Sequence, residues 1–192
     1  FGTTDITRTL CFGEATDEQR EMYTRVLKGH IELTTLSFPN GTSGQHIDLA
    51  ARRPLWDAGR NYLHGTGHGI GHYLNVHEGP ISISSRAAAV KLTEGHVLSN
   101  EPGYYADGDY GIRTENLVTV VQDLDRSIDG QKFMKFETLT RCPIQTDLID
   151  IALLGKDSCS WLNEFHATVR ETLCPMLDKE TASWLEQRTQ PI

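Results

Sequence analysis

The beginning of the chain changes from an alternating to a helical pattern of hydrophobic residues. In residues 2–12, Thr, Ile and Leu alternate with charged and hydroxyl side chains, which predicts a β-strand. Thr16, followed three residues later by Gln19, has the spacing of a helix capping box. Apolar residues then recur at helical spacing as far as about Leu36, so the first helix is predicted to end there.

The remaining pattern mixes strands and helices. A second helix is predicted over 45–58, with Pro54 kinking or restarting it. Two strands are predicted within 96–121, on either side of the turn at 107–109, and one more over 132–139. The last forty residues have helical spacing. The pattern indicates an α+β fold in which helices flank an antiparallel sheet.

Length, charge and cysteine content narrow the class of protein. A chain of 192 residues fits a single domain, and we expect 1–192 to form one. A net charge of −8 argues against binding nucleic acid through bulk charge. The sequence shows neither a membrane-length apolar run nor a signal-peptide pattern. The four cysteines form no CxxC motif and are predicted to be reduced thiols, which favours a cytoplasmic protein.

A segment rich in glycine and histidine is the first candidate for chemistry. His64, His68, His72 and His77 lie within fourteen residues. The first two are four residues apart, as in zinc-binding helices, but the interleaved glycines oppose a helix. A glycine-rich loop that aims imidazoles at a metal or a proton is the better interpretation. The alternative is that some of these rings only form structural hydrogen bonds, and for His72 alone we favour it.

Two glutamates are the second candidate. If the hairpin is symmetric about Gly108, paired positions sum to 216, and Glu101 then faces Glu115 with about 5 Å between the Cβ atoms. Two carboxylates this close repel unless a cation or a shared proton lies between them. Arg113 lies on the same strand face as Glu115 and adds positive charge. A solvated pair on an exposed face is the alternative.

Asp5 is the third candidate. Aspartate is disfavoured in the middle of a strand, so its position there calls for a reason. A metal, the Arg8 side chain or a strand edge would each supply one.

Together these segments resemble a known family. The chain is similar to the C-terminal catalytic domain of the cytosolic Xaa-Pro aminopeptidases (aminopeptidase P), which are pita-bread metallopeptidases. The resemblance extends over nearly the whole chain. The segments that carry it are GTTDITR at 2–8, HGTGH at 64–68, NVHEGP at 75–80, EPGYY at 101–105 and GIRTEN at 111–116.

The resemblance implies a pita-bread fold, of which this chain forms mostly the second half, and a site for two divalent metals, usually Mn2+. Zn2+ and Co2+ suit the same donors. The implied metal ligands are Asp5, His68, Glu101 and Glu115. Glu101 is also the implied general base toward the attacking water.

The resemblance assigns further roles around the metals. His64 and His77 would steady the tetrahedral intermediate and the leaving proline nitrogen, and Arg113 would support the site. The implied substrates are peptides with proline at the second position. The family's dimer is expected through the C-terminal helices, which carry Trp161, Phe165 and Trp184. No nucleic acid or membrane partner is expected.

One departure from the family pattern concerns the metal site. The family's first aspartate ligand lies eleven residues before the second, which would place it upstream of Phe1. For the chain as numbered, the resemblance therefore implies one tightly held metal, a second weak or absent one, and impaired activity. The alternatives are a non-catalytic pita-bread module that binds peptides or proteins, and a prolidase-like dipeptidase.

Overall fold

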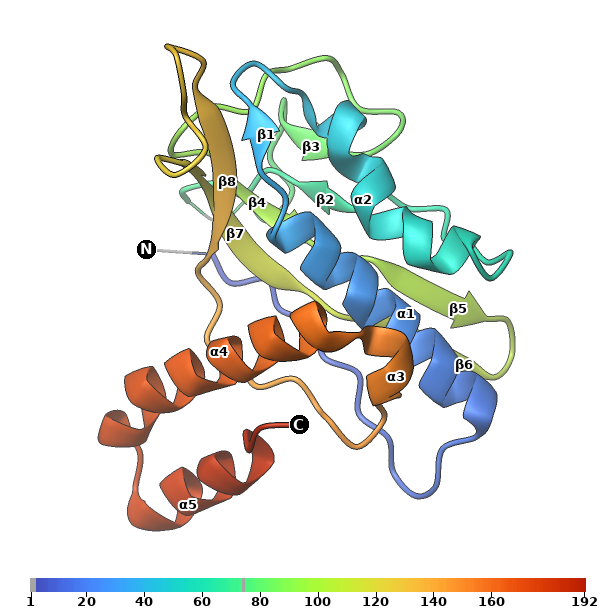
Figure 1. Ribbon diagram of the computed structural model, residues 1–192. Helices are drawn as coiled ribbons and strands as arrows, with labels where there is room; N and C mark the ends of the chain where they lie inside the picture. The colour runs from blue at the N-terminus through green and yellow to red at the C-terminus, as the bar shows by residue number, and fades with distance from the viewer. Residues whose placement is uncertain (1–2, 74) are drawn as a thin grey trace.

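The computed structural model describes residues 3–73 and 75–192, and its helices and strands are arranged as in Figure 1. The helices are α1 (Asp17–Thr34), α2 (Gly44–Trp56), α3 (Ile151–Leu154), α4 (Lys156–Leu173), the 3-10 helix η1 (Cys174–Met176) and α5 (Lys179–Arg188). The strands are β1 (Phe38–Pro39), β2 (Gly67–His68), β3 (Ser82–Ile83), β4 (Val97–Asn100), β5 (Gly103–Ala106), β6 (Tyr110–Arg113), β7 (Asn116–Gln122) and β8 (Phe133–Thr138).

Helix α1 begins where the sequence predicts. The Gln19 backbone N–H donates to the Thr16 hydroxyl at 3.2 Å, and the Gln19 side-chain oxygen accepts from the Thr16 N–H at 2.9 Å. This reciprocal capping box satisfies two donors that a helix start otherwise leaves unpaired. The predicted first helix is confirmed, and it ends at Thr34, two residues earlier than expected.

Helices α1 and α2 cross closely and cover one face of the main sheet. A Cβ atom on Gly29 would lie 2.1 Å from the carbonyl oxygen of Ala51, so only glycine permits this crossing. Helix α2 continues through Pro54 for two further residues, so the predicted restart at this proline is wrong. Side chains of both helices pack on the sheet in a shared apolar cluster that includes Leu33 and Ile47.

The predicted register of the central hairpin is confirmed. The main sheet has the antiparallel order β1-β8-β7-β4, and its Leu98 pairs with Val118. In the separate β5–β6 hairpin, Tyr104 pairs with Ile112. Both pairs sum to 216, as the symmetry about Gly108 requires.

The two predicted strands are interrupted, which is a correction to the expected pair of continuous strands. The ladder stops at Glu101 and Glu115 because their backbone N–H groups bond elsewhere. Glu101 donates to the Thr66 carbonyl at 2.7 Å, and Glu115 donates to the Thr7 carbonyl at 3.0 Å. Pro102, which has no N–H, follows directly. Four strands therefore replace two, with one glutamate at each break.

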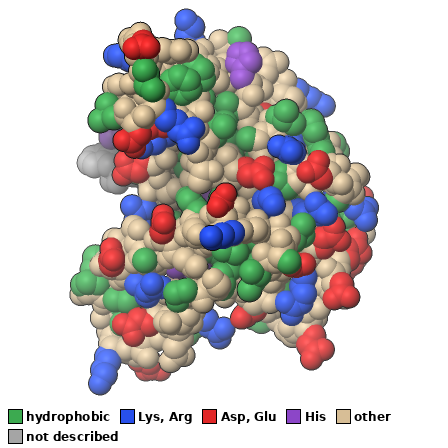
Figure 2. Space-filling view, in the orientation of Figure 1, with side chains coloured by type: hydrophobic (Ala, Val, Ile, Leu, Met, Phe, Trp, Pro, Cys, Tyr) green, Lys and Arg blue, Asp and Glu red, His purple; other side chains and the backbone are tan. Residues whose placement is uncertain are grey.

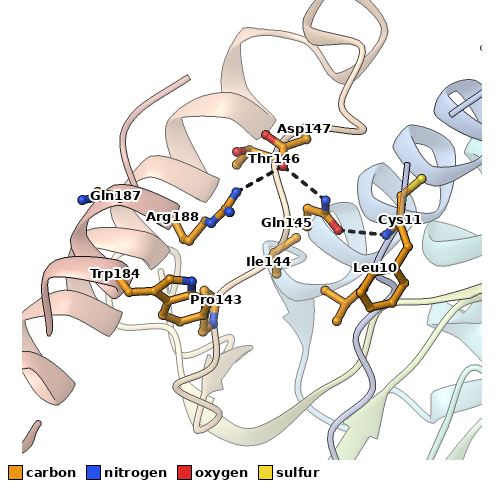
Figure 3. A pocket seen from close by; sticks show the side chains of 11 residues that line it. Leu10, Cys11, Pro143, Ile144, Gln145, Thr146, Asp147, Trp184, Gln187 and Arg188 are labelled. Atoms are coloured by element: carbon orange, nitrogen blue, oxygen red, sulfur yellow. Dashed lines mark hydrogen bonds and ion pairs between the residues drawn. The ribbon is translucent and has the colours of Figure 1, made fainter. Parts of the chain in front are cut away.

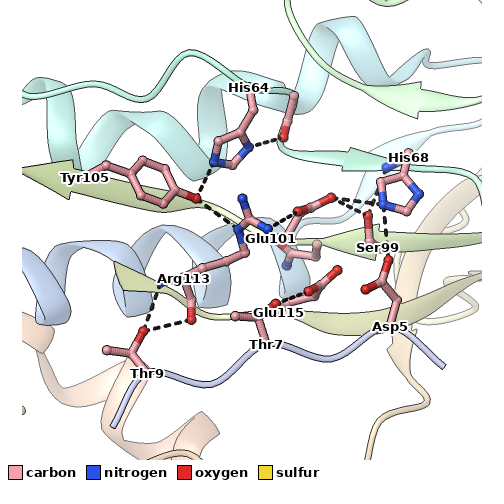
Figure 4. A network of polar contacts seen from close by, with 12 residues as sticks. Asp5, Thr7, Thr9, His64, His68, Ser99, Glu101, Tyr105, Arg113 and Glu115 are labelled. Atoms are coloured by element: carbon pink, nitrogen blue, oxygen red, sulfur yellow. Dashed lines mark hydrogen bonds and ion pairs between the residues drawn. The ribbon is translucent and has the colours of Figure 1, made fainter. Parts of the chain in front are cut away.

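The strand predicted over 2–12 is wrong for its described residues, which are 3–12. They form an extended segment outside any sheet. Thr7 makes one backbone bond to Glu115, but Thr9 holds Arg113 with its hydroxyl group, which accepts from the Arg113 N–H at 2.9 Å and donates to its carbonyl at 3.1 Å. The alternation is real even so, because Asp5, Thr7 and Thr9 all point to the same side in Figure 4.

The C-terminal residues form helices, as predicted, and these helices complete the core. Leu162, Phe165 and Val169 of α4 are buried in the cluster that also contains α1 residues, whereas Trp161 is only partly buried. All four cysteines are free thiols, as expected. Among the described residues, no helix is long and apolar enough to cross a membrane. Figure 2 shows acidic and basic side chains interspersed on one face of the molecule.

Candidate metal centre

The glycine-rich segment forms an irregular loop around the short strand β2, as the sequence predicts. A Cβ atom on Gly67 would lie 2.0 Å from the carbonyl oxygen of Ser99, so glycine lets β2 lie directly against β4. The His68 N–H donates to the Ser99 hydroxyl at 3.0 Å. These contacts place the His68 ring beside the break in β4 where Glu101 lies.

The four predicted metal ligands lie together in Figure 4. One cluster consists of His68, Glu101 and Glu115, and an overlapping cluster of Asp5, His68 and His77, each with its ligand atoms within 4.8 Å of one another. The Nε2 atom of His68 lies 3.1 Å from Glu101 Oε1 and 3.3 Å from Asp5 Oδ2. The structure therefore brings the predicted ligands to one place, from four separate segments.

The orientation of the His68 ring suits metal binding. Its Nδ1 lies 3.0 Å from the carbonyl oxygen of Gly69, which only accepts, so Nδ1 carries the proton and donates. The Nε2 lone pair then faces the carboxylates, as in histidines that ligate a metal. Without a cation, burial lowers the pKa of His68, but its hydrogen bonds to Glu101 and to the Gly69 carbonyl and the charges of Glu101 and Asp5 together outweigh burial, so the net direction of the pKa is upward.

Glu115 shows that these residues fit a cation. Its carboxylate is buried, with Oε2 accepting from the Thr7 hydroxyl and Oε1 lacking any hydrogen-bond partner among the described residues. Burial, with the nearby charges of Glu101 and Asp5, raises the pKa of Glu115 to about 7. A bare buried carboxylate oxygen costs free energy unless it is protonated or paired with positive charge. A divalent cation between these oxygen and nitrogen donors would supply that charge.

Glu101 behaves differently from Glu115 although the two face each other. Burial raises the pKa of Glu101. Hydrogen bonds from His68 and Ser99 and the charge of Arg113 together lower this pKa by more than burial raises it, so the net direction is downward. The Arg113 guanidinium lies 3.7 Å from Glu101 Oε2. Without a cation, Glu101 is therefore the more readily ionised member of the pair.

The sequence analysis missed Tyr105, which joins two predicted site residues. The Tyr105 hydroxyl accepts from Arg113 Nε at 2.9 Å and lies 2.8 Å from His64 Nε2. His64 Nδ1 bonds the Gly65 carbonyl at 2.8 Å and must donate there, so the hydroxyl donates to Nε2. Burial lowers the pKa of His64, which keeps this ring neutral.

His77 lies against His68, the histidine that is predicted to be a metal ligand. The ring centroids of His77 and His68 are 4.2 Å apart, with the ring planes inclined at 60°. The side chain of His77 is exposed, whereas that of His68 is half-buried. This position leaves His77 open to a substrate at the rim of the site.

Comparison with known proteins identifies the family of this chain. The profile of metallopeptidase family M24 matches residues 2–122, and the profile of the C-terminal region of peptidase M24 matches residues 132–192. The chain belongs to metallopeptidase family M24. The predicted family is thereby confirmed, with its site residues inside the first of the two matches.

Individual M24 relatives match over the whole of this chain. A probable Xaa-Pro aminopeptidase P of Coprinopsis cinerea is 50% identical over 100% of this chain and 32% of its own length. A crystal structure of X-prolyl aminopeptidase from Caenorhabditis elegans, described as a cytosolic enzyme with a di-nuclear active site, has a TM-score of 0.95 and 42% identity over 100% of this chain and 32% of its own.

A dipeptidase relative matches less of the M24 chain. The Xaa-Pro dipeptidase of Bacillus anthracis has a TM-score of 0.62 and 30% identity, covering 76% of this chain and 37% of its own. The structural matches confirm the predicted pita-bread fold. The chain spans about a third of the length of the curated relatives it matches.

Apart from the candidate metal site, the surface has a hollow of about 460 Å³ (Figure 3). It is lined by residues 10–12, 143–147 and part of α5, none of which is a predicted catalytic or metal-binding residue. Trp184 and Arg188 form one wall, and the Arg188 guanidinium lies 3.6 Å from Asp147. Phe12 and Trp184 are exposed there. The hollow therefore offers apolar surface for contact rather than catalytic groups.

Proposed function

We propose that this M24 chain is the catalytic part of a metal-dependent aminopeptidase that hydrolyses the peptide bond between an N-terminal residue and a following proline. The observation that carries the proposal is the convergence of Asp5, His68, Glu101 and Glu115 in two overlapping clusters, with Oε1 of Glu115 buried and without a hydrogen-bond partner among the described residues. The relatives that match over the full length of this chain carry Xaa-Pro aminopeptidase names, which supports this substrate class.

Within this proposal the four converging groups would hold the metal. Divalent cations there would lower the pKa of a bound water and polarise the scissile carbonyl. Mn2+ is the proposed ion, with Zn2+ and Co2+ suited to the same mixture of oxygen and nitrogen donors. For the chain as numbered we propose one tightly held ion, because His68, Glu101 and Glu115 form one compact cluster of donors that Asp5 joins through His68.

Each side chain of the site would have its own role in the reaction. Glu101, kept ionised, accepts a proton from the attacking water. His64 and His77 would contact the tetrahedral intermediate and the leaving proline nitrogen. Arg113 and Tyr105 fix His64, because Tyr105 accepts from the guanidinium and donates to the ring.

Three further parts of the proposal concern the assembly. We propose that 1–192 is a single fragment of the catalytic domain, its C-terminal part, supported by the core cluster that joins α1, α4 and α5. We propose a homodimer that uses the exposed Trp184, because Phe165 is already buried within the chain and is unavailable to a partner. A cytoplasmic location is proposed from the four free thiols and from the cytosolic relative.

Peptide cleavage tests the proposed function. The protein at its full natural length, loaded with Mn2+, should release the first residue from Xaa-Pro-Xaa tripeptides and should cleave Xaa-Pro dipeptides more slowly. Faster cleavage of the dipeptides would instead support a prolidase. If metal binds but neither peptide is cleaved, the chain would be a non-catalytic binding module.

A further inference from the structure

A fully buried histidine bonds to the neighbours of both glutamates, and the proposed proton transfers do not use it. His30 on α1 has no exposed surface. Its ring lies between the backbone of Asn100, which precedes Glu101, and the side chain of Asn116, which follows Glu115. Asn100 and Asn116 also pair with each other across β4 and β7. The imidazole thus bonds to both strands at the point where the ladder breaks.

The directions of the ring's hydrogen bonds to Asn116 and Asn100 follow from Arg8, and the backbone of Thr114 makes a further contact with the ring. Arg8 only donates, and its Nη2 lies 2.7 Å from Oδ1 of Asn116. The Nδ2 of Asn116 therefore faces His30 Nε2, at 3.1 Å, and donates to it. The opposite atom, Nδ1 of His30, carries the proton and donates to the Asn100 carbonyl at 3.2 Å. A neutral imidazole supplies this acceptor and this donor at a fixed separation.

Additional bonds close the network at both ends. Asn100 Nδ2 donates back to the His30 carbonyl and to the Thr34 hydroxyl, both at 2.9 Å. Arg8 Nη1 donates to the Glu115 carbonyl at 2.6 Å. Burial and the charge of Arg8 lower the pKa of His30 to about 3, so the ring stays neutral at the near-neutral pH at which metal binding is measured. The segment that carries Asp5, three residues before Arg8, is tied into the same network.

We propose that His30 is a positioning residue that fixes the backbone beside Glu101 and Glu115, and so the separation of their carboxylates. The inference rests on the proposed metal site. Two carboxylates that face each other repel, so the apo site must be held in place by contacts behind it. Metal sites need their ligands placed to within about 0.5 Å, and the loss of an outer-shell partner typically lowers metal affinity about 10–100-fold.

Two substitutions and a matched control test the role. His30→Leu removes both ring bonds, while His30→Gln retains an acceptor toward Asn116. Val26→Ala removes apolar packing one turn earlier on the same helix, where Val26 is fully buried and makes no polar contact. Titration calorimetry with Mn2+ on the full-length protein should show affinity about 10–100-fold lower for His30→Leu, a smaller loss for His30→Gln and no change for Val26→Ala.

A metal-free measurement separates this inference from the proposed function. In the apo protein, His30→Leu should speed hydrogen exchange at the Glu101 and Glu115 amides, and Val26→Ala should not. If the wild-type protein binds no metal, the proposed function fails. If the wild-type and His30→Leu proteins bind Mn2+ equally, the positioning role fails while the function stands. If His30→Leu does not fold, His30→Gln decides instead. The positioning role is overturned if His30→Gln binds Mn2+ as tightly as the wild type and its Glu101 and Glu115 amides exchange at the wild-type rate.

Discussion

Replacing Arg52 by leucine should destabilise the fold strongly, because this guanidinium is buried and holds the histidine loop. Arg52 Nε lies 2.6 Å from Asp48, and the two side chains are only 6% and 4% exposed. Its Nη1 donates to the Tyr62 carbonyl at 2.7 Å and its Nη2 to the His64 carbonyl at 2.8 Å. Thr66 also donates to Asp48, at 2.5 Å.

The magnitude follows from what Arg52→Leu leaves behind. Among the residues that the structure describes, Asp48 would then keep Thr66 alone as a hydrogen-bond partner. Breaking a buried ion pair from one side typically costs about 3–5 kcal/mol. The two carbonyls would also lose their donors. For a chain of this length each kcal/mol lowers the melting temperature by about 2–4 °C, so we expect a fall of roughly 6–20 °C.

Thermal unfolding and urea unfolding would measure this loss. Arg53→Leu is the matched control, because Arg53 is the next residue on α2 and is exposed, and it should change stability by less than about 0.5 kcal/mol. The double variant Asp48→Leu with Arg52→Leu should recover part of the loss, since no unpaired charge remains. A loss below about 1 kcal/mol for Arg52→Leu would refute the reasoning.

Three further predictions concern the site and its acid sensitivity. Glu115→Gln should abolish metal binding and peptide cleavage while the melting temperature of the apo protein stays near that of the wild type; retention of metal, measured by elemental analysis, would contradict its role as a ligand. His77→Ala should lower kcat with metal content unchanged, and loss of metal would instead make His77 a ligand. The share of urea stability that His166 contributes should fall by up to about 3 kcal/mol between pH 6.5 and 4, because burial lowers the pKa of His166 to about 4 and only the unfolded chain takes up the proton in that range. His166→Gln should remove this share of the pH slope and leave the share of the buried His30, whose pKa is also lowered.

The sequence predicted the hairpin register from local spacing, whereas the set of candidate ligands was implied by the resemblance of short motifs to a known family. Once Gly108 is taken as the centre, every pair in the hairpin follows from one sum. The same register could also have predicted that Tyr105 lies close to Arg113. Gly103 pairs with Arg113, so Tyr105 is the diagonal neighbour of Arg113 on the hairpin, within reach of a long side chain.

Other features depend on contacts that no local pattern contains. The extended segment near Thr7 looks like a strand because its residues alternate, but whether it joins a ladder depends on how Glu115 bonds more than a hundred residues later. His30 lies on an ordinary helical stripe, and its partners Asn100 and Asn116 come from strands that the sequence does not place beside α1. Their roles appear only when three segments come together.

The shared register of the two strand pairs has a consequence for protein engineering. The tip at 107–109 lies outside both ladders, and a Cβ atom at Gly108 would meet no other atom within 4 Å. A peptide tag or a fluorescent label inserted at this tip would extend the hairpin outward, without altering any pair that sums to 216. A single residue inserted beside Glu101 or Glu115 would instead turn every later side chain of that strand to the opposite face. The tip is therefore the place at which the chain accepts added length, and the breaks are the places at which it does not.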